Sequence, residues 1–284
     1  MQILVTGSNG QLGSELREIA SKYKDHQFLF TDIGELDITS AEAIALFFKG
    51  TKIDCVINCA GFTAVDKAES DVMGANLLNG LAAGYLAEAA SKAKALMIHI
   101  STDYVFDGKN HKPYSESDAT GPKTAYGKSK LNGEVEVIFN ASRSVIIRTS
   151  WLYSHHGHNF VKTILNKARE TESLRVVYDQ IGTPTYAADL ATAILDIIPK
   201  LSPKVRGEIY NYSNEGVCSW YDFALAIIEM QGIKCGVTPV QSKEFKTAAA
   251  RPHYSVLDKA RFRKDFGREI PHWRESLKRC LEKM

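Results

Sequence analysis

The sequence has little of what marks secreted or membrane proteins. Its 284 residues contain only five cysteines and eight prolines, and no two cysteines form a CxxC pair. A sparse, odd set of cysteines in a long chain excludes a disulfide scaffold, so we expect buried, reduced thiols. The sequence also lacks an uninterrupted run of about 18 apolar residues, and its N-terminus resembles a buried strand rather than a signal peptide. We therefore expect a cytoplasmic protein without a membrane partner.

Charge of one sign is also scarce. The 35 lysines and arginines nearly balance the 33 aspartates and glutamates, which leaves a formal net charge of +2 at pH 7. No run of five or six basic residues occurs, and this argues against nucleic acid as a partner. Because 44% of the residues are hydrophobic, the chain has enough apolar material for a large globular core.

Short apolar segments alternate with helical patterns in the first half of the chain. The predicted strands cover residues 3–6, 27–31, 55–58, 96–101 and 145–148, and the predicted helices cover 12–23, 40–49, 74–94 and 124–140. Strands that alternate with helices of this length favour right-handed βαβ units. The pattern predicts an α/β fold with a Rossmann-type, doubly wound parallel sheet.

The second half of the chain is less regular. It predicts helices at 159–170, 186–198, 219–231, 256–266 and the C-terminus, and strands at 174–177 and 208–212. We expect one domain over residues 1–150, to which part of 174–212 returns. Residues 151–284 would then form mainly a smaller lobe for substrate binding, over the carboxyl edge of the sheet where open α/β sheets bind ligands.

Three glycines lie between the first predicted strand and the first predicted helix. Gly7, Gly10 and Gly13 form a GxxGxxG pattern. Glycines here permit a tight turn and close approach of a pyrophosphate, and the helix N-terminus offers free N–H groups. The position of the pattern at the first strand–helix junction predicts an NAD(P)-binding domain. Further cofactor-binding candidates in this loop are Asn9, Gln11 and Leu12.

An acidic residue ends the second predicted strand. The carboxylate of Asp32 could accept hydrogen bonds from an adenosine ribose and would repel a 2′-phosphate, which favours NADH over NADPH. A capping or turn role is the alternative for this residue. Asp37 and Ile38 follow in a loop where an adenine could lie, and Asp37 could equally cap a helix.

Small residues follow the third predicted strand. Cys59, Ala60, Gly61 and Thr63 would let a cofactor lie against the backbone. Close packing of the chain on itself is an equal alternative for this segment.

The residues with the strongest chemical pattern follow the fourth predicted strand. Hydroxyls at its end, including Thr102, would face the ligand crevice. Tyr126 and Lys130 are four residues apart, so they share one face of a helix. A lysine ammonium beside a phenol lowers the tyrosine pKa from about 10 and prepares it for proton transfer. A surface helix with scattered Tyr and Lys is the alternative, but the strand and glycine context favours catalysis.

In order and spacing, these residues resemble the extended short-chain dehydrogenase/reductases. More narrowly, the chain resembles the dTDP-4-dehydrorhamnose reductases nearly from end to end. The matching blocks are Thr63-Ala64-Val65-Asp66-Lys67-Ala68-Glu69, residues 101–108, Arg148-Thr149-Ser150-Trp151, Asn159-Phe160-Val161-Lys162-Thr163, Asp179-Gln180-Ile181-Gly182-Thr183-Pro184-Thr185 and Ala250-Arg251-Pro252. The resemblance implies reduction of the C4 ketone of dTDP-4-dehydro-β-L-rhamnose to dTDP-β-L-rhamnose by NADH or NADPH, the last step of dTDP-rhamnose biosynthesis.

The resemblance also implies residue roles. Tyr126 would donate a proton, Lys130 would tune it and hold the nicotinamide ribose, and Thr102 would bind the reacting oxygen. Asn79 corresponds to an asparagine near the cofactor. The implied substrate-binding positions are Val65, Thr102, Asp103, Tyr104, Trp151, Asn159 and Arg251, and a core role is the alternative for Trp151.

Some members of the family form a homodimer through Mg²⁺ held by glutamates. Glu15 and Glu282 match such positions, but Asp189 stands where a third glutamate is expected. This departure puts the site in doubt, although magnesium can bind a shorter acid through water. Metal binding and a homodimer are therefore left open.

Two other functions remain open. The chain could be another extended nucleotide-sugar reductase or epimerase, since only the sugar contacts would differ. It could also be a non-catalytic, cofactor-binding regulatory subunit, as some relatives are for methionine adenosyltransferase. The presence of Thr102, Tyr126 and Lys130 together argues against a pure binder.

Overall fold

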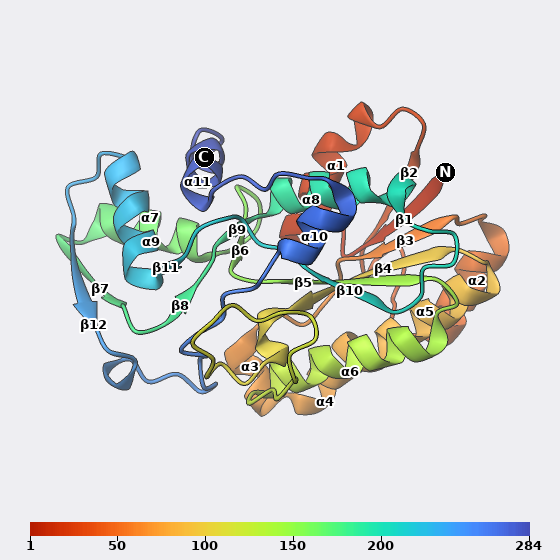
Figure 1. The fold of residues 1–284 in the computed structure, drawn as a ribbon, viewed down its shortest axis with the longest axis horizontal. Coiled ribbons are helices and arrows are strands. Elements are labelled where there is room, and N and C mark those ends of the chain that lie inside the picture. The colour runs from red at the N-terminus through yellow and green to blue at the C-terminus, as the bar shows by residue number, and fades with distance from the viewer.

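The computed structural model describes all residues from 1 to 284 and has a six-stranded parallel sheet at its centre (Figure 1). The strand order is β10-β5-β4-β3-β1-β2, so the chain winds outward from the middle in both directions. The strands are β1 (Gln2–Thr6), β2 (Gln27–Thr31), β3 (Cys55–Asn58), β4 (Leu96–Thr102), β5 (Ser144–Thr149) and β10 (Glu208–Asn211). This architecture confirms the predicted α/β, doubly wound parallel fold.

Helices cover both faces of the sheet. One face carries α1 (Gln11–Ile19), α8 (Ala187–Ile197) and α10 (Ala260–Phe266); the other carries α2 (Ala41–Gly50), α5 (Ala82–Lys92) and α6 (Ala125–Asn140). Successive strand residues pack on opposite sides, because side chains alternate along a strand. Ile3 and Val5 join the first helix layer, whereas Leu4 joins the second. Apolar strands buried on both faces are what a parallel sheet requires.

Nine elements of the second half of the chain pack around a separate apolar core beside the carboxyl edge of the sheet. They are β6 (Leu152–Tyr153), α7 (Phe160–Glu170), β7 (Ser173–Val177), β8 (Ile181–Gly182), β9 (Thr185–Tyr186), β11 (Cys218–Ser219), α9 (Trp220–Met230), β12 (Gly236–Val240) and α11 (Trp273–Leu281). The core of this part includes Phe223 from α9 and Leu277 from α11. In Figure 1 these elements form the left part of the molecule, away from the N-terminus.

Two predicted helices differ from the structure, and some elements of the structure were not predicted. The helix predicted at 74–94 is divided into α4 (Val72–Asn76), a π-helical turn (Leu77–Leu81) and α5, and a helix that was not predicted, α3 (Val65–Ser70), precedes it. The helix predicted from residue 256 begins only at Ala260. Strand β12 was not predicted because it contains Pro239, a residue that weakens a strand prediction and is tolerated in edge strands.

Caps fix where the helices near the sheet edge begin. The Thr124 side chain accepts a hydrogen bond from Gly127 N at 3.0 Å and begins α6, and Asn159 caps α7 through Lys162 N at 3.1 Å. Side-chain oxygens at these positions satisfy N–H groups that have no partner within the helix. The caps therefore set the position of Tyr126, in the first turn of α6.

All five cysteines are free: Cys55, Cys218 and Cys280 are buried, whereas Cys59 and Cys235 are partly exposed. None of the helices has the length and apolar character needed to cross a membrane.

Candidate active site

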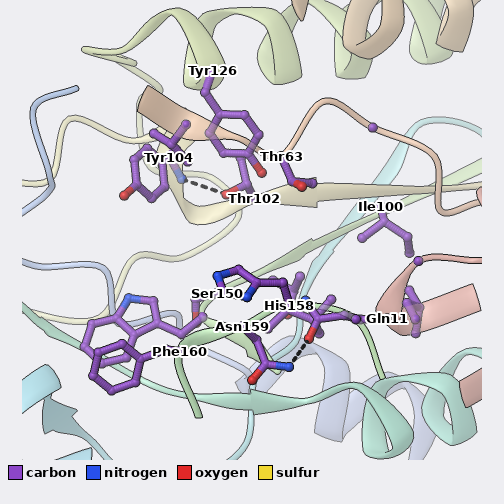
Figure 2. A pocket seen from close by; sticks show the side chains of 18 of the residues that line it. Gln11, Thr63, Ile100, Thr102, Tyr104, Tyr126, Ser150, His158, Asn159 and Phe160 are labelled. Atoms are coloured by element: carbon purple, nitrogen blue, oxygen red, sulfur yellow. Dashed lines mark hydrogen bonds between the residues drawn. The ribbon is translucent and has the colours of Figure 1, made fainter. Parts of the chain in front are cut away.

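A single cavity of about 1420 Å³ runs from the glycine loop, past the ends of β4 and β5, to the separate core. Figure 2 shows side chains that line it, with Tyr126, Thr102 and Tyr104 on one side and Asn159 and Phe160 on the other. Its wall includes all the predicted site residues except Gly13, Asn79 and the three metal candidates. Because the wall combines apolar surface with a few polar groups, the cavity has the character of a ligand site.

The glycine loop leaves open backbone where a diphosphate would lie. Gly7 has a left-handed φ of 65°, and a Cβ there would lie 2.6 Å from Ala60 Cα. A Cβ at Gly13 would lie 2.5 Å from Ser8 Cα, so this glycine packs helix α1 on its own loop rather than lining the cavity. The N-terminus of α1, at Gln11, faces the cavity. Free N–H groups and bare backbone at this point fit the phosphates of NAD(P).

Asp32 and Asp37 line the same cavity, at the end near the glycine loop. Asp32 accepts a hydrogen bond from Asn9 N at 2.9 Å, so it also holds the glycine loop in place. Asp37 accepts hydrogen bonds from Thr39 N and Thr39 Oγ1 at 2.9 and 2.7 Å, and these bonds lower its pKa. Both carboxylates therefore form local turns, and both line the cavity beside Ile38.

The loop after β3 lies against the glycine loop and is fixed from behind. Asn79 accepts a hydrogen bond from Phe62 N at 2.8 Å and donates to Ser129 Oγ at 2.9 Å. Its side chain is buried and does not line the cavity, so in this structure it supports the loop. Cys59, Ala60, Gly61 and Thr63 do line the cavity. Burial raises the pKa of Cys59 to about 12, so its thiol stays protonated.

Thr102, the last residue of β4, and the next two residues, Asp103 and Tyr104, bring polar groups to the cavity. Thr102 Oγ1 donates a hydrogen bond to Asp103 Oδ1 at 2.9 Å and accepts one from Tyr104 N at 3.3 Å (Figure 2). Burial raises the pKa of Asp103 to about 6, although the hydrogen bond from Thr102 acts against it. Its other oxygen, Oδ2, has no hydrogen-bond partner. A buried oxygen without a partner beside a cavity can accept a hydrogen bond from a group in that cavity.

Tyr126 projects from the first turn of α6 toward Thr102 (Figure 2). Its ring meets the Tyr104 ring edge-on, with 5.4 Å between the centroids. Burial raises the pKa of Tyr126 above its usual value of about 10, while the neighbouring Thr102 hydroxyl acts in the opposite direction. The sequence predicted a lowered pKa through Lys130, so in this structure the direction of the shift was wrong. A phenol in this state keeps its proton at neutral pH.

Lys130 is turned toward strand β4 rather than toward the phenol. Its Nζ donates to Ile100 O at 2.6 Å and lies 3.5 Å from His99 Nε2. Burial lowers the pKa of Lys130 to about 8, and Glu134 acts against that shift. Lys130 still lines the cavity one helical turn after Tyr126, so its ammonium faces both the β4 backbone and the ligand space.

His99 is a buried group beneath the site that the sequence analysis did not single out. Asn58 Oδ1 accepts a hydrogen bond from Ala60 N at 3.1 Å, which leaves Asn58 Nδ2 to donate to His99 Nδ1 at 3.1 Å. The proton of the neutral imidazole is therefore assigned to Nε2, which faces Lys130. Burial, followed by the nearby Lys130 charge, lowers the pKa of His99 well below 6.5.

Trp151 occupies a strained position at the opposite side of the cavity. Its φ of 47° lies in the left-handed region, which costs a residue with a side chain about 1–2 kcal/mol. The indole stacks on Trp220 with 3.5 Å between ring centroids and an angle of 8°, and both rings line the cavity. Phe160 packs against Trp220 at 4.5 Å. The strain is thus held by packing at a ligand surface.

Two polar contacts cross between segments that are far apart in the sequence. Asn159 Nδ2 donates to Gln11 Oε1 at 2.9 Å and joins the cap of α7 to the glycine loop (Figure 2). Arg251 forms an ion pair with Asp66 and donates to Tyr104 Oη at 3.4 Å. Val65, which begins α3 beside Asp66, also lines the cavity. The predicted substrate-binding residues thus all line one cavity, on its two opposite sides.

Sequence reasoning missed the far end of the cavity. This end is lined by residues of α7, β7, α9 and the 241–250 segment: Lys167, Ser173, Leu174, Arg175, Val176, Val177, Trp220, Phe245 and Thr247. These residues form no short motif, because they come from four separate segments of the irregular second half. The basic side chains of Lys167 and Arg175 were the available signal.

The residues considered for Mg²⁺ do not form one site. Asp189 accepts hydrogen bonds from Arg279, Ser276 and Asn214 at 2.5–2.9 Å, and Glu282 is an exposed residue at the end of α11. The group of metal-capable side chains that contains Glu15 includes neither of them. Within one chain, Glu15, Asp189 and Glu282 thus do not converge on one point, and Arg279 already pairs with Asp189.

Comparison with known proteins places this cavity in a defined family. The family described as the RmlD substrate binding domain matches residues 1–284. The spore coat polysaccharide biosynthesis protein SpsK of Bacillus subtilis is 43% identical over 99% of this chain and 97% of its own. A dTDP-4-dehydrorhamnose reductase from Clostridium acetobutylicum has 42% identity and a TM-score of 0.95, over 100% of this chain and 99% of that one.

A third similar protein carries a bound cofactor. The dTDP-4-dehydrorhamnose reductase of Bacillus anthracis, solved in complex with NADP, is 37% identical with a TM-score of 0.95, over 100% of this chain and 99% of that one. The match of fold, length and sequence extends over the whole chain. The chain therefore belongs to the RmlD substrate binding domain family.

Proposed function

We propose that the chain reduces the C4 ketone of dTDP-4-dehydro-β-L-rhamnose to dTDP-β-L-rhamnose with NADH or NADPH, the last step of dTDP-rhamnose biosynthesis. The observation that carries the proposal is one cavity that contains both the glycine loop at Gly7 and the pair Thr102 and Tyr126. A cofactor on the loop would extend toward the phenol, as hydride transfer requires. The names of the relatives from Clostridium acetobutylicum and Bacillus anthracis support the substrate.

In this proposal, residues 1–150 with β10 hold the cofactor. The open backbone at Gly7 and Gly10 binds the diphosphate, Asp32 binds the adenosine ribose and Lys130 binds the nicotinamide ribose. Asp32 would disfavour a 2′-phosphate, whereas the relative from Bacillus anthracis was solved with NADP. Because Asp32 already accepts a hydrogen bond from Asn9 N, its carboxylate should repel a 2′-phosphate less. We therefore propose that the chain uses both NADH and NADPH.

Residues 151–284 would mainly hold the sugar nucleotide. Asp103 Oδ2, buried and without a partner, accepts a sugar hydroxyl, and Trp151 offers an apolar face to the ring. Arg251 keeps N–H donors free for the diphosphate beside its pair with Asp66. Val65, Tyr104 and Asn159 complete the wall around these groups.

The chemistry of the side chains follows from their protonation states. The bound NAD(P)H supplies the hydride to C4 of the sugar. Tyr126, protonated because burial raises its pKa, gives its proton to the carbonyl oxygen, which Thr102 also binds. The positive charge of the Lys130 ammonium, one helical turn away, then favours the phenolate until solvent returns the proton. Positioning by α6 and β4 keeps these groups in place before the reaction.

The proposal is tested by an absorbance assay of NADH and NADPH oxidation with dTDP-4-dehydrorhamnose. We expect cofactor oxidation with this sugar nucleotide and formation of dTDP-rhamnose. Turnover only with other 4-keto nucleotide sugars would favour a different reductase, and no turnover with any of them would favour a regulatory binder.

A variant separates catalysis from binding in the same assay. Tyr126→Phe removes only the hydroxyl, so kcat should fall by about 10²–10⁴-fold while the cofactor Kd stays within about twofold. Tyr85→Phe, in a side chain outside the cavity, is the matched control and should keep full activity. An unchanged kcat in Tyr126→Phe would contradict the assigned role.

A further inference from the structure

We propose that Glu18, His155 and His156, together with Glu15, form a binding site for a divalent transition-metal ion of the Zn²⁺ class. One ligand atom from each of the four side chains lies within 4.8 Å of the other three. None of these four residues lines the catalytic cavity. The site is therefore distinct from the proposed reductase site.

Two elements bring the four side chains together. Helix α1 places Glu15 and Glu18 on one face, because residues three apart are neighbours on a helix. The segment after β6 brings His155 and His156 across to that face. Both imidazole Nε2 atoms lie 2.7 Å from the same oxygen, Glu18 Oε1, and the two rings are only 3.9 Å apart between centroids. The nitrogens thus converge on one point.

Glu15 gives a second, independent reason to place a ligand here. Its side chain is completely buried, and Oε1 accepts a hydrogen bond from Ser154 Oγ at 2.6 Å. Its other oxygen, Oε2, has no hydrogen-bond partner, and neither has His155 Nδ1, which is 3.3 Å from Glu15 Oε1. Leaving a buried polar oxygen unpaired costs about 1–3 kcal/mol. A cation at this point would satisfy it.

The donor set selects the kind of metal. Imidazole nitrogens suit Zn²⁺ and its neighbours, whereas Mg²⁺ prefers an octahedron of oxygens and retains water. Zinc–nitrogen bonds of about 2.0–2.1 Å place tetrahedral ligands roughly 3.3 Å apart. The present ligand atoms, some at 2.7 Å and all within 4.8 Å, reach that spacing by small side-chain rotations. Lys283 occupies the other oxygen of Glu18 at 2.8 Å and leaves Oε1 for the metal.

The position of the site indicates a structural role. Helix α1 begins at the glycine loop, and the segment with His155 and His156 leads to Asn159, which binds Gln11. A metal ion would fasten these two segments a few residues from that contact. It would hold the first strand–helix junction to the part of the chain that carries the substrate residues.

The test is metal binding to full-length protein freed of metal with EDTA and dialysed. We expect about one Zn²⁺ per chain by calorimetry, visible absorption bands on addition of Co²⁺, and a higher Tm with Zn²⁺. Mg²⁺ at the same concentration should give none of these. His155→Ala and His156→Ala should each weaken Zn²⁺ binding by at least about tenfold, and His111→Ala, an exposed histidine elsewhere, should not.

Three outcomes would overturn the proposal. The first is wild-type protein that binds neither Zn²⁺ nor Co²⁺. The second is Zn²⁺ binding that is equal in wild type and both histidine variants, which would place the ion elsewhere. The third is tighter binding of Mg²⁺ than of Zn²⁺. Circular dichroism in EDTA verifies that each variant is folded, so a loss of binding is not a loss of structure.

Discussion

Lys130 and His99 show how a buried basic group can be held near its point of ionisation. When Lys130 is charged, Lys130 Nζ and His99 Nε2 face each other as two N–H donors. The reason is that Asn58 Nδ2 donates to His99 Nδ1, which leaves the imidazole proton on Nε2. The contact therefore favours a neutral lysine, in the same direction as burial, whereas Glu134 and the Ile100 carbonyl favour the ammonium. With a pKa of about 8, Lys130 is mostly an ammonium at pH 7 and loses its proton as the pH rises through about 8.

From this we predict the alkaline limb of the reaction. Since the ammonium is needed to stabilise the phenolate, kcat/KM should fall as pH rises through about 8. His99→Gln replaces the facing donor with an amide whose oxygen accepts, so the pKa of Lys130 rises. The limb should then move to higher pH by on the order of 1 unit. The pH profile of kcat/KM measures this, His111→Gln is the control, and an unmoved limb contradicts the argument.

At this scale the sequence predicted which side chains lie together better than it predicted their environment. Strand ends and helical spacing placed Thr102, Tyr126 and Lys130 together, and all three line the cavity. The direction of the Tyr126 shift was wrong, since spacing does not show that the Lys130 amine bonds to Ile100. His99 could not be found, because one histidine in an apolar strand is normally a core residue.

At the scale of elements, a buried ion pair joins α6 to the sheet. Arg148 in β5 binds Glu134 in α6 through two hydrogen bonds of 2.9 and 2.7 Å, with side chains only 3% and 2% exposed. Ser101 in β4 donates to the same carboxylate at 2.5 Å. The helix that carries Tyr126 and Lys130 is thus fixed to both strands whose ends form the site.

We predict that Arg148→Met destabilises the protein strongly. The substitution leaves a buried carboxylate without its partner, which costs about 3–5 kcal/mol in the free energy of unfolding. Chemical denaturation of wild type and variant measures the difference. Lys92→Ala, which removes the exposed pair with Glu88, should change stability by about 0.5 kcal/mol or less. Equal, small effects of the two substitutions would show that the buried pair is dispensable.

The elements of the first half could be predicted, and many of the second half could not. Strands buried on both faces leave apolar runs bounded by glycine and polar turns, so β1 to β5 were located to within a residue or two. Strands β6, β8, β9 and β11 have two residues each and carry no periodicity. The π-helical turn after α4 contains one residue more than an α-helical turn. The hydrophobic periodicity of the sequence does not reveal this extra residue.

At the scale of the whole molecule, the cavity lies between the central sheet and the separate core. Segments from residue 7 to residue 251 contribute to its wall, so a ligand touches both parts at once. The Asn159–Gln11 contact is one of the bonds that join the two parts next to the proposed cofactor position. Binding should therefore stabilise the molecule as a unit.

We predict this coupling in thermal unfolding. At a concentration of about 100 times its Kd, NADPH should add about 2.7 kcal/mol to the free energy of unfolding. This should raise Tm by roughly 5–10 °C in a chain of this size. Gly7→Ala forces a Cβ to 2.6 Å from Ala60 Cα and should lower Tm and abolish the rise. Gly232→Ala has a similar φ of 61° but open space around it, so it should lose stability and keep the rise. Equal behaviour of the two variants would separate the glycine loop from cofactor binding.

The stacked pair of Trp151 and Trp220 has a spectroscopic consequence. The chain has three tryptophans, and two of them share one wall of the cavity while Trp273 is buried in the neighbouring core. Reduced nicotinamide absorbs light where indole emits, so energy passes from these rings to a cofactor bound in the same space. The intrinsic fluorescence of the unmodified protein is thus an internal gauge of whether its cavity is filled.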